Sequence, residues 1–393
     1  MVELLAPAGT FLKLKTAFKF GADAVYFAGK KFGLRAFAGN FDDNEIEEAV
    51  KYAHSLNKKV YITVNIIAHE PDFSGLAEYI RELDNLGVDA LIVADLGIIK
   101  LIREVAPNME IHVSTQANIT NSYSAKVFAD MGVKRIVLAR ELSLSEIKEI
   151  RKNLPKEIEL EAFVHGAMCI SYSGRCLLSN FLTGRDGNRG ACVQACRWEY
   201  TITEKTRQGQ QFPIEEDGRG TYILNSKDLC MLNHLNDLED AGVTSFKIEG
   251  RMKSEYYVAC VVNAYRRMLD GEKMDISEVE KTSHRLFTTG FYYGENNKEC
   301  YESSSPVQTH EFIAMVQENT KNGYVKIQQR NRFKVGDILE VLSPDENFNK
   351  QFIVTEIKNA KGEFIDDAKR VQEELYLKTD INLKEGDILR IKK

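Results

Sequence analysis

The sequence predicts an α/β protein, in which a (βα)8 TIM-type barrel is followed by a small antiparallel β-barrel domain. The first observation is a phrase that recurs four times, as GADAVYFAG, GVDALIVAD, GVKRIVLAR and GVTSFKIEG. Each copy has a glycine suited to ending a helix, a short turn, and an apolar strand with a polar or glycine end. The second is the amphipathic stretches between the phrases, such as 43–56 and 73–86, which indicate helices. This alternation is typical of βα units.

Eight strands are predicted, near residues 2–5, 24–27, 59–65, 90–94, 111–114, 135–138, 159–164 and 245–248. Eight parallel strands over about 250 residues match a closed barrel. The rival is an open, doubly wound sheet. Its dinucleotide-binding form has a GxGxxG turn after the first strand, whereas this chain has APAG there.

The connection between the seventh and eighth strands is far longer than one helix. It runs from about residue 165 to 225 and is rich in glycine, arginine and cysteine. A loop of this length in a compact domain is usually functional or disordered. In a barrel it would lie over the mouth, beside the carboxyl ends of the strands.

Three domains follow from these patterns. Residues 1–270 form the predicted catalytic barrel, which a helix in SEYYVACVVNAYRRMLDG completes, and 271–305 form a helical linker. Hydrophobic residues then alternate with period two in EFIAMVQE, GYVKIQQ, GDILEVL, FIVTEI and GDILRIK, which predicts the β-barrel domain at 306–393.

Composition limits the classes of function. The chain has 393 residues, 44% of them hydrophobic, and a formal net charge of −6, so it is not a generally basic nucleic-acid-binding protein. Its first residues lack the charged and apolar regions of a signal peptide. No apolar run approaches the roughly 20 residues that span a bilayer. We therefore expect a cytoplasmic protein with no membrane association.

Cysteines give the clearest sign of chemistry. Four of the seven lie in one short polar stretch with spacing C-x6-C-x15-C-x3-C, namely Cys169, Cys176, Cys192 and Cys196. In a reducing compartment, clustered thiols favour a metal over disulfides. The spacing matches neither zinc ribbons nor ferredoxins, so zinc and an iron–sulfur cluster both remain open. Cys230 is the reserve ligand, whereas Cys260 lies on an apolar helix face and is predicted to be core.

Polar residues follow the predicted strands where a barrel enzyme has its active site. They include Asn65, Gln116, Arg140, His165 and Glu249. The sequence therefore predicts a candidate site at the mouth of the barrel, next to the cysteines.

The chain resembles peptidase family U32, the collagenase-like proteases. The resembling segments are ELLAPAG, GADAVYFAG, FVHGAMCISYSGRCLLSNFLTGRDGNRGACVQACRWEY, NSKDL and SFKIEGR, and the β-rich tail is similar to the family's C-terminal module. Within the family, the chain looks most like the branch that hydroxylates the wobble uridine of bacterial tRNA. A related branch hydroxylates a cytidine of ribosomal RNA.

The resemblance implies a [4Fe–4S] cluster and, for the RNA branches, prephenate as the probable oxygen donor. Carried over by motif, the cluster ligands are Cys169, Cys176, Cys192 and Cys196, of which the fourth is exchangeable with Cys230. The implied macromolecular substrate is a tRNA anticodon loop, and a partner subunit of the same family is left open.

Roles at the mouth are assigned from residue chemistry. We expect Asn65, Gln116 and Glu249 to contact the base and His165 to act in acid–base catalysis. For the anionic donor or the RNA we expect contacts from Arg140, Arg175, Arg251, Arg197 and Tyr172.

Two other classes of function are retained. A U32-type peptidase would use a cysteine nucleophile near His165, because the chain has neither HExxH nor GxSxG. A binding protein stabilised by zinc would use the same four cysteines.

Overall fold

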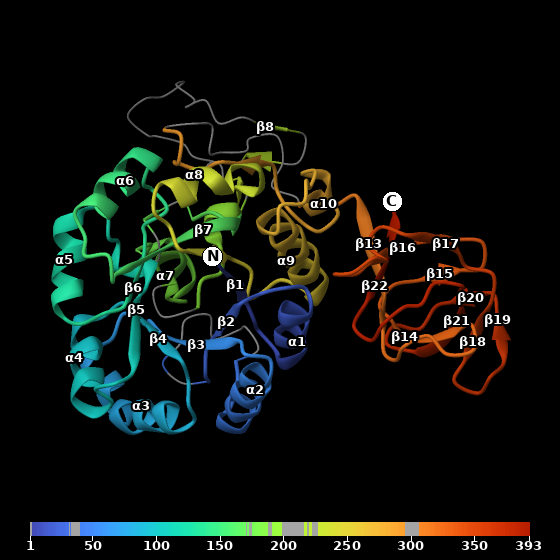
Figure 1. Cartoon of the computed structure of the whole chain (residues 1–393), viewed down its shortest axis with the longest axis horizontal. Coiled ribbons are helices and arrows are strands. Elements are labelled where there is room, and N and C mark those ends of the chain that lie inside the picture. Colours follow the sequence, from blue (N-terminus) through green and yellow to red (C-terminus); the bar gives the residue numbers. More distant parts are fainter. Residues whose placement is uncertain are drawn as a thin grey trace. The chain divides into compact units, whose positions relative to one another are not determined.

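The computed structural model describes residues 2–30, 32, 40–169, 171–172, 175–187, 191–198, 216–217, 220–221, 227–294 and 306–393. The chain forms two compact units, which Figure 1 draws. The first comprises residues 1–14, 22–252 and 285–306, and the second comprises 15–21, 253–284 and 307–393. The predicted limits of three independent domains stay a prediction.

The first unit is built on a closed parallel barrel, as the sequence predicted. Neighbouring strands pair in chain order, and the last strand pairs with both the seventh and the first. The barrel strands are β1 (Glu3–Pro7), β2 (Ala24–Phe27), β3 (Lys59–Val64), β4 (Ala90–Val93), β5 (Glu110–Val113), β6 (Arg135–Val137), β7 (Glu159–Ala167) and β11 (Ser245–Ile248). Strands such as β2 and β4 are buried along their whole length, as expected for a parallel sheet covered by helices.

Helices follow the strands around the barrel. They are α1 (Phe11–Lys19), α2 (Asp43–Ser55), α3 (Leu76–Asn85), α4 (Leu96–Val105), α5 (Ser122–Asp130), α6 (Leu144–Lys152) and α8 (Leu235–Asp240), whereas α9 (Glu255–Leu269), which follows the last barrel strand in the chain, belongs to the second unit. Capping residues explain several starts: Asp42 and Ser143 each form a capping box, with Glu45 and Glu146 respectively. The glycines of the recurring phrase adopt positive φ, for example +77° at Gly87, which is the left-handed backbone that ends a helix.

Two short strands of the barrel sheet were not predicted. β10 (Asp228–Cys230) pairs antiparallel with the outer half of β7, and β12 (Phe287–Thr288) pairs parallel with β10. They extend the barrel sheet beyond β7 after the cysteine-rich connection. Other short elements of the first unit are η1 (Glu70–Phe73), η2 (Thr115–Ala117), α7 (Leu178–Thr183), η4 (Ala195–Arg197), β8 (Glu216–Asp217), β9 (Gly220–Thr221) and η5 (Leu232–His234).

The second unit contains an eight-stranded antiparallel sheet that forms a half-barrel, together with α9 and α10 (Ser277–Glu280). The sheet order is β17-β16-β22-β13-β14-β21-β18-β19, with a separate β15–β20 pair. Its strands are β13 (His310–Val316), β14 (Tyr324–Gln329), β15 (Phe333–Lys334), β16 (Ile338–Leu342), β17 (Gln351–Ile353), β18 (Ile357–Asn359), β19 (Phe364–Ile365), β20 (Asp367–Ala368), β21 (Glu374–Lys378) and β22 (Ile388–Lys392). The predicted period-two pattern is confirmed, since β14 alternates between buried and half-buried side chains.

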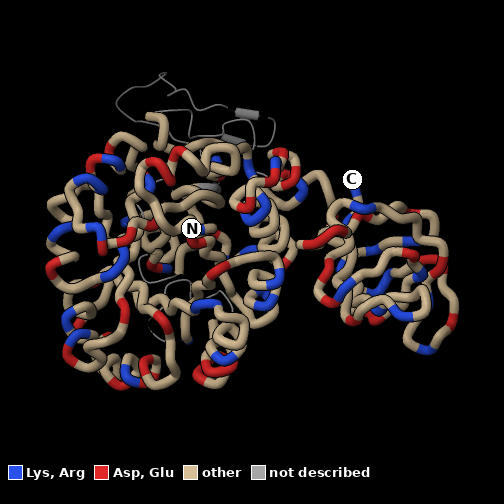
Figure 2. The backbone as a smooth tube through the Cα atoms, viewed as in Figure 1, with Lys and Arg blue, Asp and Glu red and all other residues tan. Residues whose placement is uncertain are grey.

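Charges are interspersed along both units. Figure 2 shows Lys and Arg scattered among Asp and Glu along the chain.

In the part of the chain that the structure describes, no helix is both long and apolar enough to cross a bilayer.

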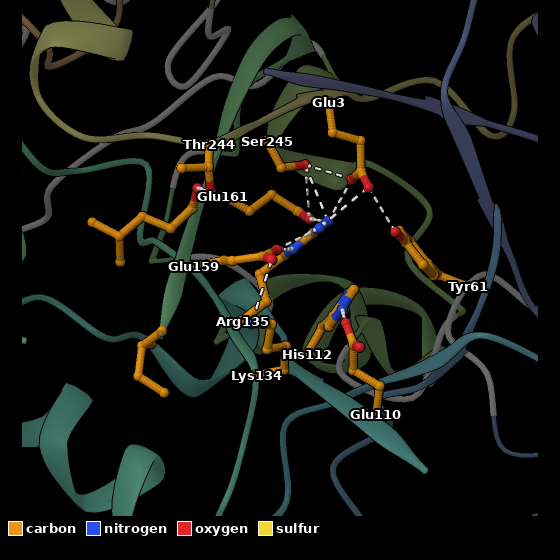
Figure 3. A network of polar contacts seen from close by, with 12 residues as sticks. Glu3, Tyr61, Glu110, His112, Lys134, Arg135, Glu159, Glu161, Thr244 and Ser245 are labelled. Carbon is orange, nitrogen blue, oxygen red and sulfur yellow. Dashed lines mark hydrogen bonds and ion pairs between the residues drawn. The ribbon is translucent and has the colours of Figure 1, made fainter. Parts of the chain in front are cut away.

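A charged network fills the interior of the barrel near the amino ends of its strands (Figure 3). The guanidinium of Arg135 lies 2.5 Å from a carboxylate oxygen of Glu3 and 3.1 Å from one of Glu161. Tyr61 donates a hydrogen bond of 2.7 Å to Glu3, and Ser245 donates one of 2.9 Å. Side chains from five different barrel strands can meet in this way only inside the cylinder.

Arg135 governs the ionisation of this network. Burial by itself would raise the pKa of the Glu3 carboxyl, but the ion pair with Arg135 outweighs burial and lowers that pKa to about 2. Burial also opposes the charge of Glu161, yet Lys247 at 2.7 Å and Arg135 hold its pKa below the usual value. The interior therefore holds paired charges where barrels usually hold branched apolar side chains.

Candidate active site

The carboxyl ends of the barrel strands carry the polar residues that the sequence singled out. Asn65 directly follows β3, Gln116 lies in η2 after β5, and His165 lies in the outer half of β7. Glu249 directly follows β11, and Arg251 is two residues further on. Four of these side chains are buried: His165 is 1%, Arg251 4%, and Gln116 and Glu249 7% exposed. Their catalytic roles stay predictions.

Asn65 and Gln116 are held together through one hydroxyl group. The side-chain nitrogen of Asn65 donates to Ser114 Oγ at 3.2 Å, and the backbone N–H of Gln116 donates to the same oxygen at 3.4 Å. The oxygens of both side-chain amides are buried and have no partner among the described residues. Buried polar atoms are nearly always paired with protein or water, so two unpaired amide oxygens at the end of a barrel are candidates to bind a ligand.

Glu249 is held by a tyrosine that the sequence analysis did not single out. Tyr26 Oη lies 3.0 Å from the carbonyl oxygen of Ile248 and 3.3 Å from a carboxylate oxygen of Glu249. The ammonium group of Lys247 lies 4.5 Å from the centre of the Tyr26 ring. A cation over an aromatic face is attracted to it, so Lys247 links the charged interior to the site.

Two of the predicted arginines are fixed at the ends of strands. Arg140 stacks on Phe163, with its guanidinium carbon 4.1 Å from the ring centre, and donates to the carbonyl oxygen of Ala167 at 2.8 Å. Arg251 donates to the hydroxyl of Thr63 at 3.3 Å. Both guanidinium groups are therefore preorganised, which suits them to bind an anion.

His165 lies on β7, where that strand pairs with β10 and with β11, both of which are far from it in the sequence. Its carbonyl oxygen accepts the backbone N–H of Glu249 at 2.8 Å. Cys230 on β10 is its direct partner in the antiparallel pairing with β7. Cys230, the reserve ligand, is thus buried beside β7. It lies opposite His165, which precedes Cys169 by four residues in the chain.

The four clustered cysteines are not joined to one another by disulfides. Cys169 and Cys192 are exposed, and Cys176 and Cys196 are half-buried. The backbone N–H of Gln194 points at Cys192 Sγ from 3.3 Å, and a Cβ added to Gly187 would lie 3.6 Å from the same sulfur. Backbone N–H groups and close glycine contacts of this kind suit a ligating thiolate.

Convergence of these thiols is not seen among the described residues, where no three His, Cys, Asp or Glu side chains form a group that could hold a metal ion. The donor chemistry fits a soft metal centre, and the metal site stays a prediction. Cys260 is fully buried in the second unit, and burial raises the pKa of its thiol to about 12, so it remains protonated and agrees with the predicted core position.

The remaining predicted contacts lie in the cysteine-rich connection. Tyr172 is 54% exposed, and Arg175 is exposed, with its backbone N–H bonded to the carbonyl oxygen of Tyr172 at 2.9 Å. The backbone of Arg197 ends η4, and its side chain lies outside the described residues.

Gly9 packs against the backbone beside the site. A Cβ at this position would lie only 2.4 Å from the carbonyl oxygen of Arg251. We expect Gly9→Ala to displace Arg251 and to lower the free energy of unfolding by about 2 kcal/mol or more, the range of overpacking. Urea unfolding with Gly75→Ala as control measures this, because Gly75 has open space around it and only a left-handed φ of +75°. Equal losses in the two variants would contradict the predicted clash.

Sequence reasoning missed the residues that hold the site in place: Tyr26, Thr63, Ser114, Phe163 and Lys247. A signal was present for three of them, because Thr63, Phe163 and Lys247 each lie two residues before a predicted site residue, namely Asn65, His165 and Glu249. Alternate residues of a barrel strand face the interior, so these side chains share a face with the site residues.

A parallel (βα)8 barrel with buried polar side chains at its strand ends has the architecture of a barrel enzyme. The chain belongs to peptidase family U32. The family model matches residues 9–302, and the model of the U32 C-terminal domain matches residues 308–390.

Relatives in the family have different names. The tRNA hydroxylation protein P1 of Bacillus subtilis is 38% identical, over 99% of this chain and 94% of its own length. The 23S rRNA 5-hydroxycytidine C2501 synthase of Escherichia coli is 40% identical over 74% of this chain and 45% of its own length. A collagenase of Porphyromonas gingivalis is 31% identical over 74% of this chain and 72% of its own length. Among solved structures, a U32 peptidase with 15% identity has a TM-score of 0.42, covering 64% of this chain and 93% of that one.

Proposed function

We propose that this protein hydroxylates carbon 5 of the wobble uridine of tRNA. The observation that carries the proposal is similarity to a tRNA hydroxylation protein across the barrel and the C-terminal module, over 99% of this chain and 94% of the relative. The relative named for ribosomal RNA matches over only 45% of its length. The tRNA substrate is therefore favoured over ribosomal RNA.

The mouth of the barrel would bind the target base. A base in an anticodon loop can be splayed out of its stack and bound by its edges. Asn65, Gln116 and Glu249 supply amide and carboxylate groups for these edges, and Tyr172 in the exposed connection is available for stacking. His165, buried beside Glu249, is the candidate to move a proton at carbon 5.

The oxygen atom would come from a small organic donor, for which prephenate is proposed. Transfer from the donor converts the C5–H bond of the base into C5–OH, while the donor's C–OH becomes C–H. This exchange balances atoms and electrons with no further oxidant. Prephenate is a dianion, and the preorganised guanidinium groups of Arg140 and Arg251 suit its carboxylates. Arg175 and Arg197 are further candidates for the donor or for RNA phosphate.

A [4Fe–4S] cluster is proposed as the cofactor, with zinc as the alternative metal. Cys169, Cys176 and Cys192 would hold it, with Cys196 or Cys230 as the fourth ligand. The absence of disulfides between these cysteines and the backbone N–H contact to Cys192 support this assignment. When bound, the cluster would supply electron-transfer chemistry, whereas the chain's own residues bind and orient the base and the donor.

A peptidase is the second candidate, because a family member named collagenase is 31% identical over 74% of this chain. A cysteine nucleophile needs a nearby base, and Cys230 is the direct strand partner of His165. Cys230 is buried, which disfavours access by a peptide chain.

The test is an assay of anaerobically purified protein with a synthetic anticodon stem-loop and prephenate. We expect mass spectrometry of the digested RNA to show one added oxygen on the wobble uridine, and no addition without prephenate. A deletion strain should lose the same modification, and the plasmid-borne gene should restore it. An iron-loaded protein that leaves the stem-loop unchanged but cleaves gelatin would overturn the proposal in favour of the peptidase.

A further inference from the structure

Gln116 has an unusual environment for a buried residue. Its side chain is 7% exposed, yet its Oε1 has no hydrogen-bond partner among the described residues. Leaving such a group unpaired typically costs about 1–3 kcal/mol. A core position of this kind would be filled at lower cost by methionine or leucine.

The turn that carries Gln116 is held firmly. Thr115 Oγ1 donates to the carbonyl oxygen of Leu138 at 3.1 Å, and the backbone N–H of Ser114 donates to Val93 at 2.7 Å. The side chain of Asn118 donates to the backbone oxygen of Gln116 itself at 2.8 Å. The backbone is therefore fixed to β4 and β6, while the terminal amide of Gln116 stays unrestrained. Its amide can turn without breaking a hydrogen bond to any residue that the structure describes.

We propose that Gln116 binds the N3 edge of the target pyrimidine, a proposal that rests on the proposed function. A primary amide offers an acceptor next to a donor, and uracil offers the complementary pair at N3–H and an adjacent carbonyl oxygen. The unpaired Oε1 then receives the N3–H hydrogen. Carbon 5 lies away from this edge and stays free to face the oxygen donor.

The same amide turned by half a rotation matches the acceptor N3 and the amino group of cytosine. Gln116 therefore selects for a pyrimidine with an unmodified N3 edge. It does not discriminate uracil from cytosine. Asn65, tied to Gln116 through Ser114, adds a second amide with an unpaired oxygen to the same place.

The experiment is a double-mutant cycle between enzyme and substrate. Wild type and Gln116→Met are assayed on stem-loops with uridine or 3-methyluridine at the target position. We expect the N3-methyl group to lower the wild-type kcat/KM by about 10-fold or more, and Gln116→Met to lower it similarly on uridine. In Gln116→Met, the N3-methyl group should lower kcat/KM by less than about twofold, because the contact between residue 116 and the N3 edge is already absent. Gln317→Met in the second unit is the matched control and should keep the full methyl effect.

Two outcomes overturn the proposal in different ways. In the first, the wild type is active and the N3-methyl group lowers kcat/KM equally in wild type and in Gln116→Met. This result excludes the role of Gln116 and leaves the proposed function standing. A wild type that is inactive on the uridine stem-loop removes both. Thermal unfolding separates binding from a structural role, since replacing an unpaired buried amide with an apolar side chain of similar size should leave Tm unchanged or raised. A lowered Tm with an intact methyl penalty would make Gln116 structural.

Discussion

Replacing Arg135 with methionine should destabilise the barrel more than any other single change considered for this chain. Among the described residues, the variant leaves the Glu3 carboxylate with hydrogen bonds from only Tyr61 and Ser245, and it removes one of the two cations that form ion pairs with Glu161. Breaking a buried ion pair from one side typically costs about 3–5 kcal/mol. Because small and medium domains have about 5–15 kcal/mol of stability, we expect a large fall in the urea midpoint.

The neighbouring residue supplies a matched control. Lys134 is 43% exposed and lies 3.8 Å from Glu159, so Lys134→Met should cost no more than about 1 kcal/mol. Glu3→Gln added to Arg135→Met should restore part of the loss, since it removes the unpaired charge. A loss in Arg135→Met no larger than in Lys134→Met would contradict the assigned network.

Acid gives an independent check on the same pair. The folded-state pKa of Glu3 is about 2, below the ordinary value of 4.5. The ionised Glu3 therefore adds to the free energy of unfolding above about pH 4.5, and this contribution is lost as the pH falls towards 2. In Arg135→Met, Glu3 loses the strongest of the interactions that lower its pKa, so its carboxyl takes up a proton at a higher pH. The stability difference between wild type and variant should therefore narrow as the pH falls. A constant difference from pH 7 to pH 3 would exclude Glu3 as its source.

The sequence predicted the barrel because its signals are local. Gly87 and Gly132 end helices by adopting positive φ, and each is followed, after a two-residue turn, by a strand of the predicted kind. The same holds for the site, where Asn65, His165 and Glu249 lie at the predicted strand ends. Local backbone preference and burial determine these features, so a single sequence is sufficient.

The missed features depend on contacts between residues far apart in the chain. Arg135 and Glu3 are 132 residues apart and become partners only when the barrel closes. β10 has three residues and no alternation, and it exists because β7 offers it a free edge. The position of Gln116 was predicted, but its unpaired amide was not, because hydrogen-bond satisfaction depends on every neighbour in the fold.

Single Cys→Ser changes should have the largest effect on activity. We expect Cys169→Ser, Cys176→Ser and Cys192→Ser each to lose most of the iron and sulfide, and to lower RNA hydroxylation by about 100-fold or more. Serine keeps the size of the side chain but replaces a soft thiolate donor with a hard oxygen that stays protonated near neutral pH. Metal analysis, visible absorbance and turnover of anaerobically purified variants measure the effect.

The fourth ligand is decided by the same series. Cys196 is half-buried in η4 within the cysteine-rich connection, whereas Cys230 is buried in β10 opposite His165. We expect either Cys196→Ser or Cys230→Ser, but not both, to match the first three variants in iron content. Cys260→Ser is the control, because that thiol lies in the second unit, 3.6 Å from Arg390 Nη1. Stoichiometric zinc in place of iron would replace the proposed cluster with a structural metal site. Full iron content in all five variants would mean that these thiols hold no metal, and the remaining case for catalysis would rest on the polar residues at the strand ends.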